Sequence, residues 1–577
     1  MAETLISPGV LARENDQSLV TAQPQTVGAA IIGPTVKGPV EKPTYVSSFG
    51  SFQAIFGGAL ESGSTDYTYL TSIAANNYFQ QGGESLLVTR VTSGSFTPAT
   101  SSLIETGSGG PTSGLSPFVL ETISEGEIMN TGDTEISNGA LATGSADNVR
   151  WEIASVNTSS GVFSLLVRRG NDNNNQKVIL ESYNNISLDP FSSNYISRAI
   201  GDITSNVVIA GDGSGTYLQE SGSYPNISNY VRVKQVNFNT PHFFNNDGSA
   251  KDEFTGSLPA VGSGSFGDAG GSNLNATEAN NFYENIDSSN TQGLIGTDYT
   301  NAIQLLANQD DYQYNVISAP GLYYSGYGIQ CDLLKNNTIS RGDAIYVMDL
   351  VPYNTAIGIV NQNAAAVDSS YAAAYWPWLQ TVDPSTGLLV YVPASTMIPG
   401  VYAFTDASSD PWFAPAGITR GGLGSVVRAE RKLTSANRDT LYEANVNPIA
   451  TFPQQGVVVF GQKTLQKAAS ALDRVNVRRL LISLKGYISQ IADNLVFEQN
   501  TIATRQNFLT QVNPYLESVQ QRQGLYAFKV VMDETNNTPD VIDRNELIGQ
   551  IFLQPTKTAE FIILDFNVLP TGATFPA

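Results

Sequence analysis

The chain has 577 residues and a net charge of −22, with 14% charged and 41% hydrophobic residues. This length predicts three or four domains rather than one. No run of about 18 apolar residues occurs, so no transmembrane helix is expected, and the single cysteine excludes an intrachain disulfide framework. The strongly acidic balance argues against nucleic acid as a direct partner.

The first residues are predicted to be an extended arm. Residues 1–20 have no core pattern, and residues 10–14 can form a strand after the Pro8-Gly9 break. The N-terminus has no basic region followed by an apolar stretch, so no secretory signal peptide is expected.

Residues 21–95 alternate strand and helix patterns and are interpreted as the first part of a core. The small apolar residues of 27–32 and the run 86–91 indicate strands. The 3/4 spacing of apolar residues in 47–56 and 69–78 indicates two helices, each ended by a Gly-Gly pair.

Two β-rich segments follow. Residues 96–150 are rich in Ser, Gly and Thr and are expected to form an inserted outer domain, and residues 151–292 a second one. Within the second, residues 245–290 are so poor in large apolar residues that a long exposed loop region is predicted.

The next segment, 293–430, reads as an α/β core. Residues 314–318 and 344–350 are continuous apolar runs, which is typical of strands buried on both faces. A helix is expected over 301–307 between such strands.

Residues 431–557 are interpreted as a C-terminal assembly domain and 558–577 as a strand-forming arm. Apolar residues at 3/4 spacing from 477 to 495 predict an amphipathic helix. A second helix is expected over 514–523, with Pro514 in its first turn. Strands are expected over 526–532, 547–553 and 559–568.

Positive charge gathers in one place. Residues 1–430 carry a net charge of −23, whereas residues 457–490 contain six basic residues and only one acidic residue. This predicts either a face that meets an acidic partner or a solvated helix face.

Residues that carry enzyme chemistry are scarce. His242 is the only histidine, so a multi-histidine metal site is impossible and any Ser/His/Asp triad would have to use it. Cys331 lacks a ligand-spaced partner and is expected in the core. No catalytic residue, metal ligand or cofactor site is assigned, and the chain is predicted not to be an enzyme.

Three formal motif matches have simpler interpretations. The G-x-G-x-x-G of residues 262–267 lies in a Gly/Ser-rich tract without the flanking strand and helix that a dinucleotide site needs. The tripeptide 341–343 is expected in a turn. The aromatic run 375–378 could stack a sugar or a base, although core packing is the better interpretation.

The order and spacing of many short stretches resemble those of contractile tail sheath proteins of myovirus-type bacteriophages. The resemblance covers most of the chain but not residues of about 96–150 and 205–290. The stretches that carry it are Ser7-Pro8-Gly9-Val10, Val27-Gly28-Ala29-Ala30-Ile31-Ile32-Gly33, Lys37-Gly38-Pro39, Phe56-Gly57-Gly58, Leu87-Val88-Thr89-Arg90-Val91, Pro411-Trp412-Phe413-Ala414-Pro415, Gly461-Gln462-Lys463-Thr464-Leu465, Asp473-Arg474-Val475-Asn476-Val477-Arg478-Arg479-Leu480 and Asn536-Asn537-Thr538-Pro539.

The resemblance implies a multidomain α/β and α+β fold with a subtilisin-like, non-catalytic core. It implies a virion subunit, assembled in the host cytoplasm, that polymerises in stacked rings around an inner tail tube and contracts to drive the tube through the host envelope. The implied partners are further copies of the chain, the tube protein, and the baseplate and tail terminator proteins, with no cofactor, nucleic acid or membrane insertion.

Two sets of residues are assigned to this assembly. The residues expected in inter-subunit arms are Val10, Leu11, Ala12, Arg13, Glu14, Phe561, Ile562, Ile563, Leu564, Phe566 and Val568. The residues expected to face the tube are Lys463, Lys467, Arg474, Arg478 and Lys485. The alternatives are the sheath of a bacterial extracellular injection particle and, in a different class, a secreted β-rich adhesin.

Overall fold

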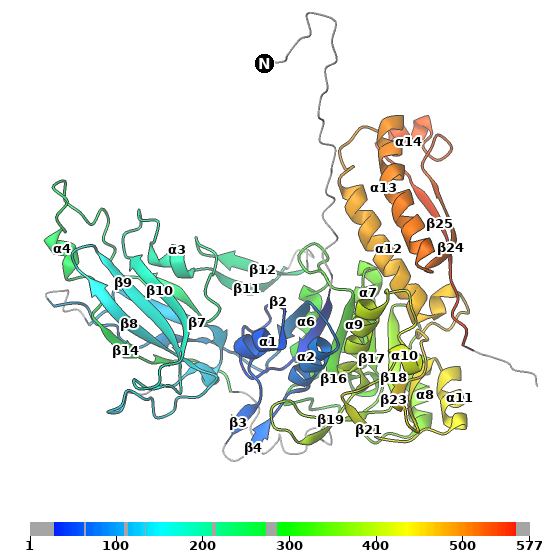
Figure 1. The fold of residues 1–577 in the computed structure, drawn as a ribbon, viewed down its shortest axis with the longest axis horizontal. Helices are drawn as coiled ribbons and strands as arrows, with labels where there is room; N and C mark the ends of the chain where they lie inside the picture. The colour runs from blue at the N-terminus through cyan, green and yellow to red at the C-terminus, as the bar shows by residue number, and fades with distance from the viewer. Residues whose placement is uncertain are drawn as a thin grey trace, which may run out of the picture.

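The computed structural model describes residues 28–62, 65–108, 114–132, 134–210, 215–272 and 285–560. Figure 1 shows an α/β core in the centre, a β domain on one side of it, and a helical C-terminal module that rises from the other side. We use these three terms for residues 29–90 with 286–465, residues 96–272, and residues 471–555, respectively.

The α/β core is built on an eight-stranded sheet in which the six inner strands run parallel. Its strands, in spatial order, are β2 (Thr44–Val46), β5 (Leu86–Arg90), β1 (Ala29–Gly33), β16 (Val316–Tyr323), β17 (Ile345–Asp349), β18 (Ala372–Trp376), β22 (Val446–Phe452) and β23 (Gly456–Val459). Every residue of β1, β5, β16, β17 and β18 is buried, as expected for parallel strands covered on both faces. The continuous apolar runs therefore predicted these strands correctly.

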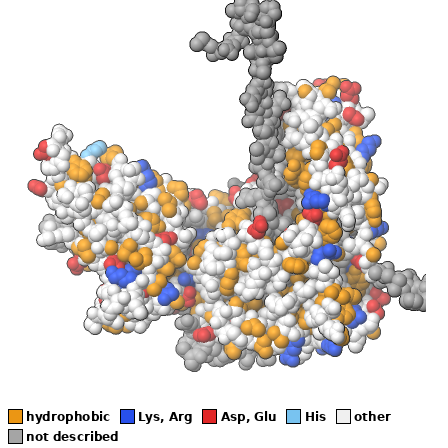
Figure 2. Space-filling view, viewed as in Figure 1, with side chains coloured by type: hydrophobic (Ala, Val, Ile, Leu, Met, Phe, Trp, Pro, Cys, Tyr) orange, Lys and Arg blue, Asp and Glu red, His pale blue; other side chains and the backbone are white. Residues whose placement is uncertain are grey.

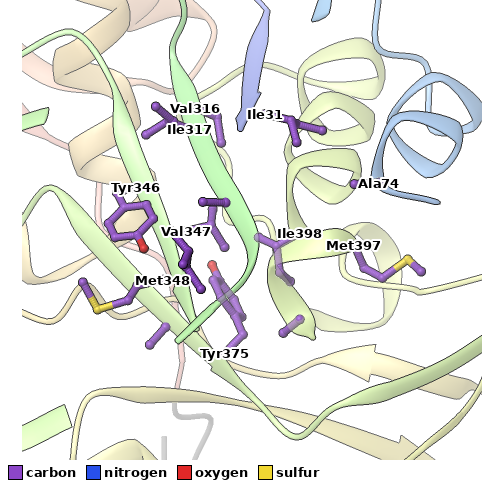
Figure 3. Packing of buried hydrophobic residues seen from close by; sticks show 14 of the residues in the cluster. Ile31, Ala74, Val316, Ile317, Tyr346, Val347, Met348, Tyr375, Met397 and Ile398 are labelled. Carbon is purple, nitrogen blue, oxygen red and sulfur yellow. The ribbon is translucent and has the colours of Figure 1, made fainter. Parts of the chain in front are cut away.

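Helices and small sheets complete the core. Helix α2 packs against β1 and α9, and α7 packs against β16, β17 and α6. Figure 3 shows Val316, Ile317 and Val347 of the sheet and Ile398 of α9, which all belong to the same buried hydrophobic cluster. The helices are α1 (Phe49–Phe56), α2 (Leu70–Gln80), α6 (Thr300–Leu305), α7 (Tyr324–Arg341), α8 (Ile357–Ala366), α9 (Ile398–Ser408), α10 (Gly417–Arg420) and α11 (Ser435–Glu443), with 3-10 turns η2 (Gly296–Tyr299) and η3 (Ala394–Thr396). The small sheets are β3 (Leu60–Ser62) with β4 (Thr65–Tyr67), and β20 (Leu389–Val392) with β19 (Leu379–Val382) and β21 (Val426–Ala429).

The β domain contains two four-stranded sheets around one hydrophobic cluster, which includes Phe118, Trp151, Phe163 and Phe266. One sheet is β10 (Ile179–Ser187), β9 (Val162–Arg169), β8 (Val149–Asn157) and β14 (Gly262–Gly264); the other is β13 (Val231–Val236), β7 (Phe118–Glu125), β6 (Pro98–Ser101) and β15 (Phe266–Gly267). The hairpin β11 (Thr204–Ile209) and β12 (Thr216–Ser221), the helices α3 (Ile196–Ile200) and α4 (Asp252–Thr255), and the turn η1 (Glu127–Met129) complete it.

Two expectations for this region differ from the structure. The boundary placed at residue 150 falls inside β8, and segments on both sides of it share the same cluster. The long exposed loop expected over 245–290 is wrong in part, because Leu258 and Phe266 are fully buried and β14 and β15 pair with β8 and β6. Single apolar residues among glycine and serine give no periodic signal, so these short strands could not be recognised.

The C-terminal module has two long helices against a two-stranded sheet. Its elements are η4 (Ala471–Asp473), α12 (Val475–Asp493), α13 (Ile502–Gln521), β24 (Leu525–Val531), α14 (Pro539–Asp543) and β25 (Gln550–Pro555). The amphipathic pattern of 477–495 predicted α12 correctly. The boundary at 431 lies too early, because α11, β22 and β23 belong to the core.

Two element boundaries in this module were wrong. Helix α13 begins at Ile502, where the Thr501 hydroxyl accepts a hydrogen bond from the backbone N–H of Thr504, so exposed Pro514 lies inside the helix rather than in its first turn. Strand β25 starts at 550 instead of 547, because the Asn537 amide bonds both the N–H and the C=O of Ile548 at 2.9 Å.

Candidate assembly surface

The sheet of the C-terminal module is incomplete on its outer side. Within the described ranges, β24 and β25 pair only with each other, so each has one edge without a neighbouring strand. Phe528 and Leu553 pack toward the helices, whereas Tyr526 and Phe552 point outward with 63% and 56% of their surface exposed. A two-stranded sheet is marginal by itself, and open edges of this kind accept a further strand.

The helices hold this sheet in place through one hydrophobic cluster. The cluster contains Leu480 and Leu484 of α12, Val512 and Leu516 of α13, and Trp412, which comes from the core. Figure 2 shows charged side chains of both signs on the module, with hydrophobic side chains between them. The module is therefore a packed unit whose two-stranded sheet has open edges within the described residues.

The two predicted arms lie outside the described residues. Residues 10–14 and 561–568 are not described, so their assignment as inter-subunit arms stays a prediction. Of the strand expected over 559–568, the structure describes only Ala559 and Glu560, and neither is in a strand.

The residues expected to face the tube divide into two groups. Arg474 pairs with Asp473 and Glu560, and Lys463 donates to the carbonyl of Tyr442 at 2.7 Å. Arg478 lies 3.9 Å above the centre of the Tyr371 ring and donates to Ser370.

Burial lowers the pKa of Arg478, while that of Arg474 is raised because hydrogen bonds and charge from Glu560 outweigh the effect of burial. These contacts hold the module on its own core. The side chains of Lys467 and Lys485 are exposed, which leaves them as the members of the set best placed to meet a partner.

A buried arginine that was not singled out joins the module to the core. Arg479, with 4% of its side chain exposed, donates to both carboxylate oxygens of Asp406 in α9 at 2.7 and 2.6 Å. Its guanidinium lies 4.6 Å from the centre of the Tyr402 ring. Its position next to Arg478 in an amphipathic helix was visible in the sequence, but its partner, 73 residues away, was not.

The structure shows the surroundings of the single cysteine and the single histidine. Cys331 is fully buried, and burial raises the pKa of its thiol to about 12. His242 is exposed and stacks on Phe191 at 4.4 Å between ring centres. No group of His, Cys, Asp and Glu side chains in the described part of the chain could hold a metal ion.

The three motif matches at residues 262–267, 341–343 and 375–378 lie in ordinary elements of the fold. Residues 262–267 form the short strands β14 and β15, which pair antiparallel with β8 and β6 in the β domain, and no helix follows within the described residues up to 272. This is not the parallel strand–turn–helix context that a dinucleotide site needs. Gly342 has φ 71° and ends α7, as a turn requires. Tyr375, Trp376 and Trp378 are at most 4% exposed, so they cannot stack a sugar or a base from solvent, and the adhesin alternative loses this feature.

One buried carboxyl group has an unusual environment. Asp349, at the end of β17, accepts hydrogen bonds from the backbone N–H (3.1 Å) and the hydroxyl of Ser395. Burial raises the pKa of Asp349 to about 7, against the opposite effect of these hydrogen bonds. The group is therefore a pH-dependent element of core stability.

Replacing Asp349 by Asn should make the core less sensitive to pH. Because the folded pKa is raised, the contribution of Asp349 to stability is fully present below its ordinary pKa and is lost as pH rises through about 7. Between pH 5 and 9 we expect wild-type unfolding free energy to fall by on the order of 2 kcal/mol relative to Asp349→Asn. Guanidinium unfolding at each pH measures this difference; parallel curves would contradict it.

None of the helices in the described residues is long and apolar enough to cross a membrane.

Comparison with protein families identifies two domains in the chain. Residues 292–465 match the phage tail sheath protein central domain, and residues 467–569 match the phage tail sheath C-terminal domain. Residues 292–569 of the chain therefore carry two domains of phage tail sheath proteins. These matches cover much of the α/β core and the C-terminal module.

Two curated sheath relatives agree. The chain is 41% identical over 216 residues to the tail sheath protein of Vibrio phage KVP40, and 37% identical over 229 residues to that of Enterobacteria phage T4. These alignments cover 37% and 40% of this chain, but only 31% and 35% of the relatives. The chain therefore spans about a third of the length of these sheath proteins.

A crystal structure extends the likeness beyond the matched domains. The sheath tail protein of Listeria innocua superposes with a TM-score of 0.51 at 9% identity, covering 92% of this chain and 95% of that one. At this identity the comparison bears on the fold alone. It supports a mixed α/β multidomain sheath fold.

Proposed function

We propose that this chain is a structural subunit of a contractile phage tail sheath, without enzymatic activity. It polymerises as a helical tube around an inner tail tube and contracts to drive that tube through the host envelope. The observation that carries the proposal is the pair of sheath domain matches over 292–569, which include the module with its open strand edges.

The proposal includes the partners and the site of action. The chain would contact further copies of itself, the inner tail tube protein, and the baseplate and tail terminator proteins. It would be assembled in the host cytoplasm and reside in the virion tail. Its parallel, helix-covered sheet is compatible with a subtilisin-like topology that has lost catalysis, since the single His242 lies in the β domain rather than in the core.

The orientation follows from the shape. The β domain and the C-terminal module lie at opposite sides of the core in Figure 1. If the module faces the tube, the β domain projects outward, where limited proteolysis of assembled sheaths would cut first. The segments that link subunits would be residues 10–14 and 561–568, added as strands to the β24–β25 sheet of a neighbour.

Electron microscopy of the purified protein tests the proposed function. Hollow, striated tubes are the expected result, because sheath subunits stack as rings. A chain that stays a dispersed monomer at high concentration, both alone and with an inner tube, would contradict it.

Reversing the charge of Lys467 and Lys485 together should weaken binding to the tube. Both lysines are exposed, and the only side-chain contact described for them is a 3.3 Å hydrogen bond from Lys485 to the Tyr371 hydroxyl, so Lys467→Glu with Lys485→Glu should leave the fold intact. Arg474 and Arg478, in contrast, could not be changed without disturbing several contacts within the subunit. Each exposed contact is worth about 0–1 kcal/mol, but many copies add along a sheath. Co-sedimentation with tubes over a salt series measures the effect.

The matched control for this experiment is Lys234→Glu with Lys432→Glu. These lysines are also exposed; Lys234 lies in the β domain, where it pairs with Glu121 at 3.7 Å, and Lys432 lies between β21 and α11 of the core, so the charge change is the same and the location differs. Equal tube binding by both double variants would contradict the tube-facing assignment.

A further inference from the structure

The last described residues cross from the C-terminal module to the α/β core. Thr556 stays with the module: its N–H and hydroxyl donate to the carbonyls of Gly524 and Gln523 at 3.2 and 2.7 Å. Two residues later, the hydroxyl of Thr558 accepts a hydrogen bond from Gln462 at 2.5 Å. Residues 556–560, which we call the strap, therefore tie β25 to the loop that follows β23.

The strap ends in a carboxylate held from several directions. Arg474 donates to both oxygens of Glu560, at 2.7 and 3.0 Å. Tyr442, at the end of α11, donates at 2.9 Å, and Gln462 donates at 3.1 Å. One carboxylate thus receives four hydrogen bonds from three separate segments of its own subunit.

The electrostatics keep this carboxylate charged. Burial acts to raise the pKa of Glu560, but the hydrogen bonds from Arg474, Tyr442 and Gln462 lower it below its ordinary value. Hydrogen bonds between charged groups are about twice as strong as neutral ones, and a two-point arginine–carboxylate pair also fixes the geometry.

We propose that Glu560 anchors the root of the C-terminal arm to its own subunit. The inference rests on the proposed sheath function, in which residues 561–577 are held by a neighbouring copy. Tension on that arm then acts on the Glu560 contacts before it reaches β25. The arm can therefore pull on a neighbour without detaching the strand from its own sheet.

The geometry of β25 explains why an anchor is needed. Its C-terminal end, Pro555, pairs with Leu525, and Pro555 has no N–H to donate across the sheet. Without the Glu560 contacts, a pull from residue 561 would meet only the hydrogen bonds of Thr558 and Thr556 before it reached this weak end and separated β25 from β24 one hydrogen bond at a time. The four bonds at Glu560 must instead break together, and they lie between the arm and the strand.

Trypsin cleavage after Lys557 tests the anchor in the monomer. Lys557 is exposed but lies in the strap, so the backbone must detach before it can enter the protease. In Glu560→Gln, which keeps the size of the side chain, release of fragment 558–577 should be about tenfold faster by mass spectrometry, because cleavage follows the population of the detached state. Tyr442→Phe, which removes a single donor, should accelerate it less.

The matched control is Glu546→Gln. Glu546 pairs with Arg544 at 3.0 Å, but both side chains are about half exposed, so the rate at Lys557 should stay at the wild-type value. Sheaths of Glu560→Gln should also assemble but dissociate at lower guanidinium concentration than wild-type or control sheaths.

Equal cleavage rates in Glu560→Gln and the wild type would overturn the anchor, as would faster cleavage with sheaths as resistant as the wild type. A wild-type chain that forms no tubes would overturn the proposed function and, with it, the mechanical role. The cleavage rates do not depend on tubes, so the two failures can be told apart.

Discussion

Removal of residues 561–577 should abolish tube formation and leave a folded monomer. The chain would end at Glu560, so the strap, the β24–β25 sheet and the hydrophobic cluster of the C-terminal module keep all of their described residues. Only the apolar segment 561–568 and the tail after it are lost. If that segment adds to the sheet of a neighbour, its loss removes a set of main-chain hydrogen bonds at every subunit contact.

Three measurements decide this prediction. Circular dichroism and gel filtration should report a folded monomer, and electron microscopy should show no tubes. A chain that lacks only residues 570–577 is the matched control, because it keeps the predicted strand and should still assemble. Normal tubes from the chain ending at 560 would contradict the arm, and unfolding of that chain would favour the alternative in which the strand completes its own subunit's sheet.

Removal of residues 1–20 examines the other arm in the same way. Residues 10–14 form the only part of this segment with a strand pattern. If both arms are needed, each truncated chain should fail to form tubes alone and should also fail when the two are mixed, because every contact needs both arms of intact subunits.

The sequence predicted the core strands well because burial on both faces leaves a strong local signal. The apolar runs of 27–32, 86–91, 314–318 and 344–350 each became a strand of one parallel sheet. The 3/4 spacing of 477–495 likewise predicted α12. Continuous hydrophobicity and helical periodicity appear within a short stretch of consecutive residues, so they can be recognised without knowing the fold.

Domain boundaries depend on pairings between strands that are far apart in the sequence, and a short stretch of sequence does not show these pairings. Strand β1 pairs with β16, which lies almost 290 positions later, and β22 joins the core across the boundary expected at 431. The basic segment shows the same limit for the assembly surface. Its charge was evident, but whether Arg474 and Arg478 point to a partner or to their own subunit depends on Glu560 and Tyr371, which are distant in the chain.

The contact between Arg479 and Asp406 predicts a large loss of folding stability when Arg479 is replaced. Two bonds at 2.7 and 2.6 Å connect a nearly buried guanidinium of α12 to α9, and the same guanidinium covers the ring of Tyr402. The Tyr402 hydroxyl in turn bonds that of Tyr375 at 2.7 Å in the core. The arginine thus joins the C-terminal module to α9 of the core, in addition to the contacts of Arg474 and Arg478.

Arg479→Met should lower the free energy of unfolding by about 2 kcal/mol, because it leaves the Asp406 carboxylate, 31% of whose side chain is exposed, without its partner. Burial already raises the pKa of Asp406 despite Arg479, so loss of the arginine should raise it further. The stability of the variant should then decrease more steeply than that of the wild type as pH rises above 4. Guanidinium unfolding over a pH series measures both effects.

Two further variants separate the ion pair from the loss of a side chain. Arg544→Met removes an arginine from an exposed pair with Glu546 and should leave the free energy of unfolding nearly unchanged. Arg479→Met combined with Asp406→Leu removes both charges and should recover most of the lost stability, since the penalty comes from the unpaired carboxylate. If Arg479→Met is as stable as Arg544→Met, or if the double variant is no better than the single one, the module is held on the core by its hydrophobic cluster and not by this pair.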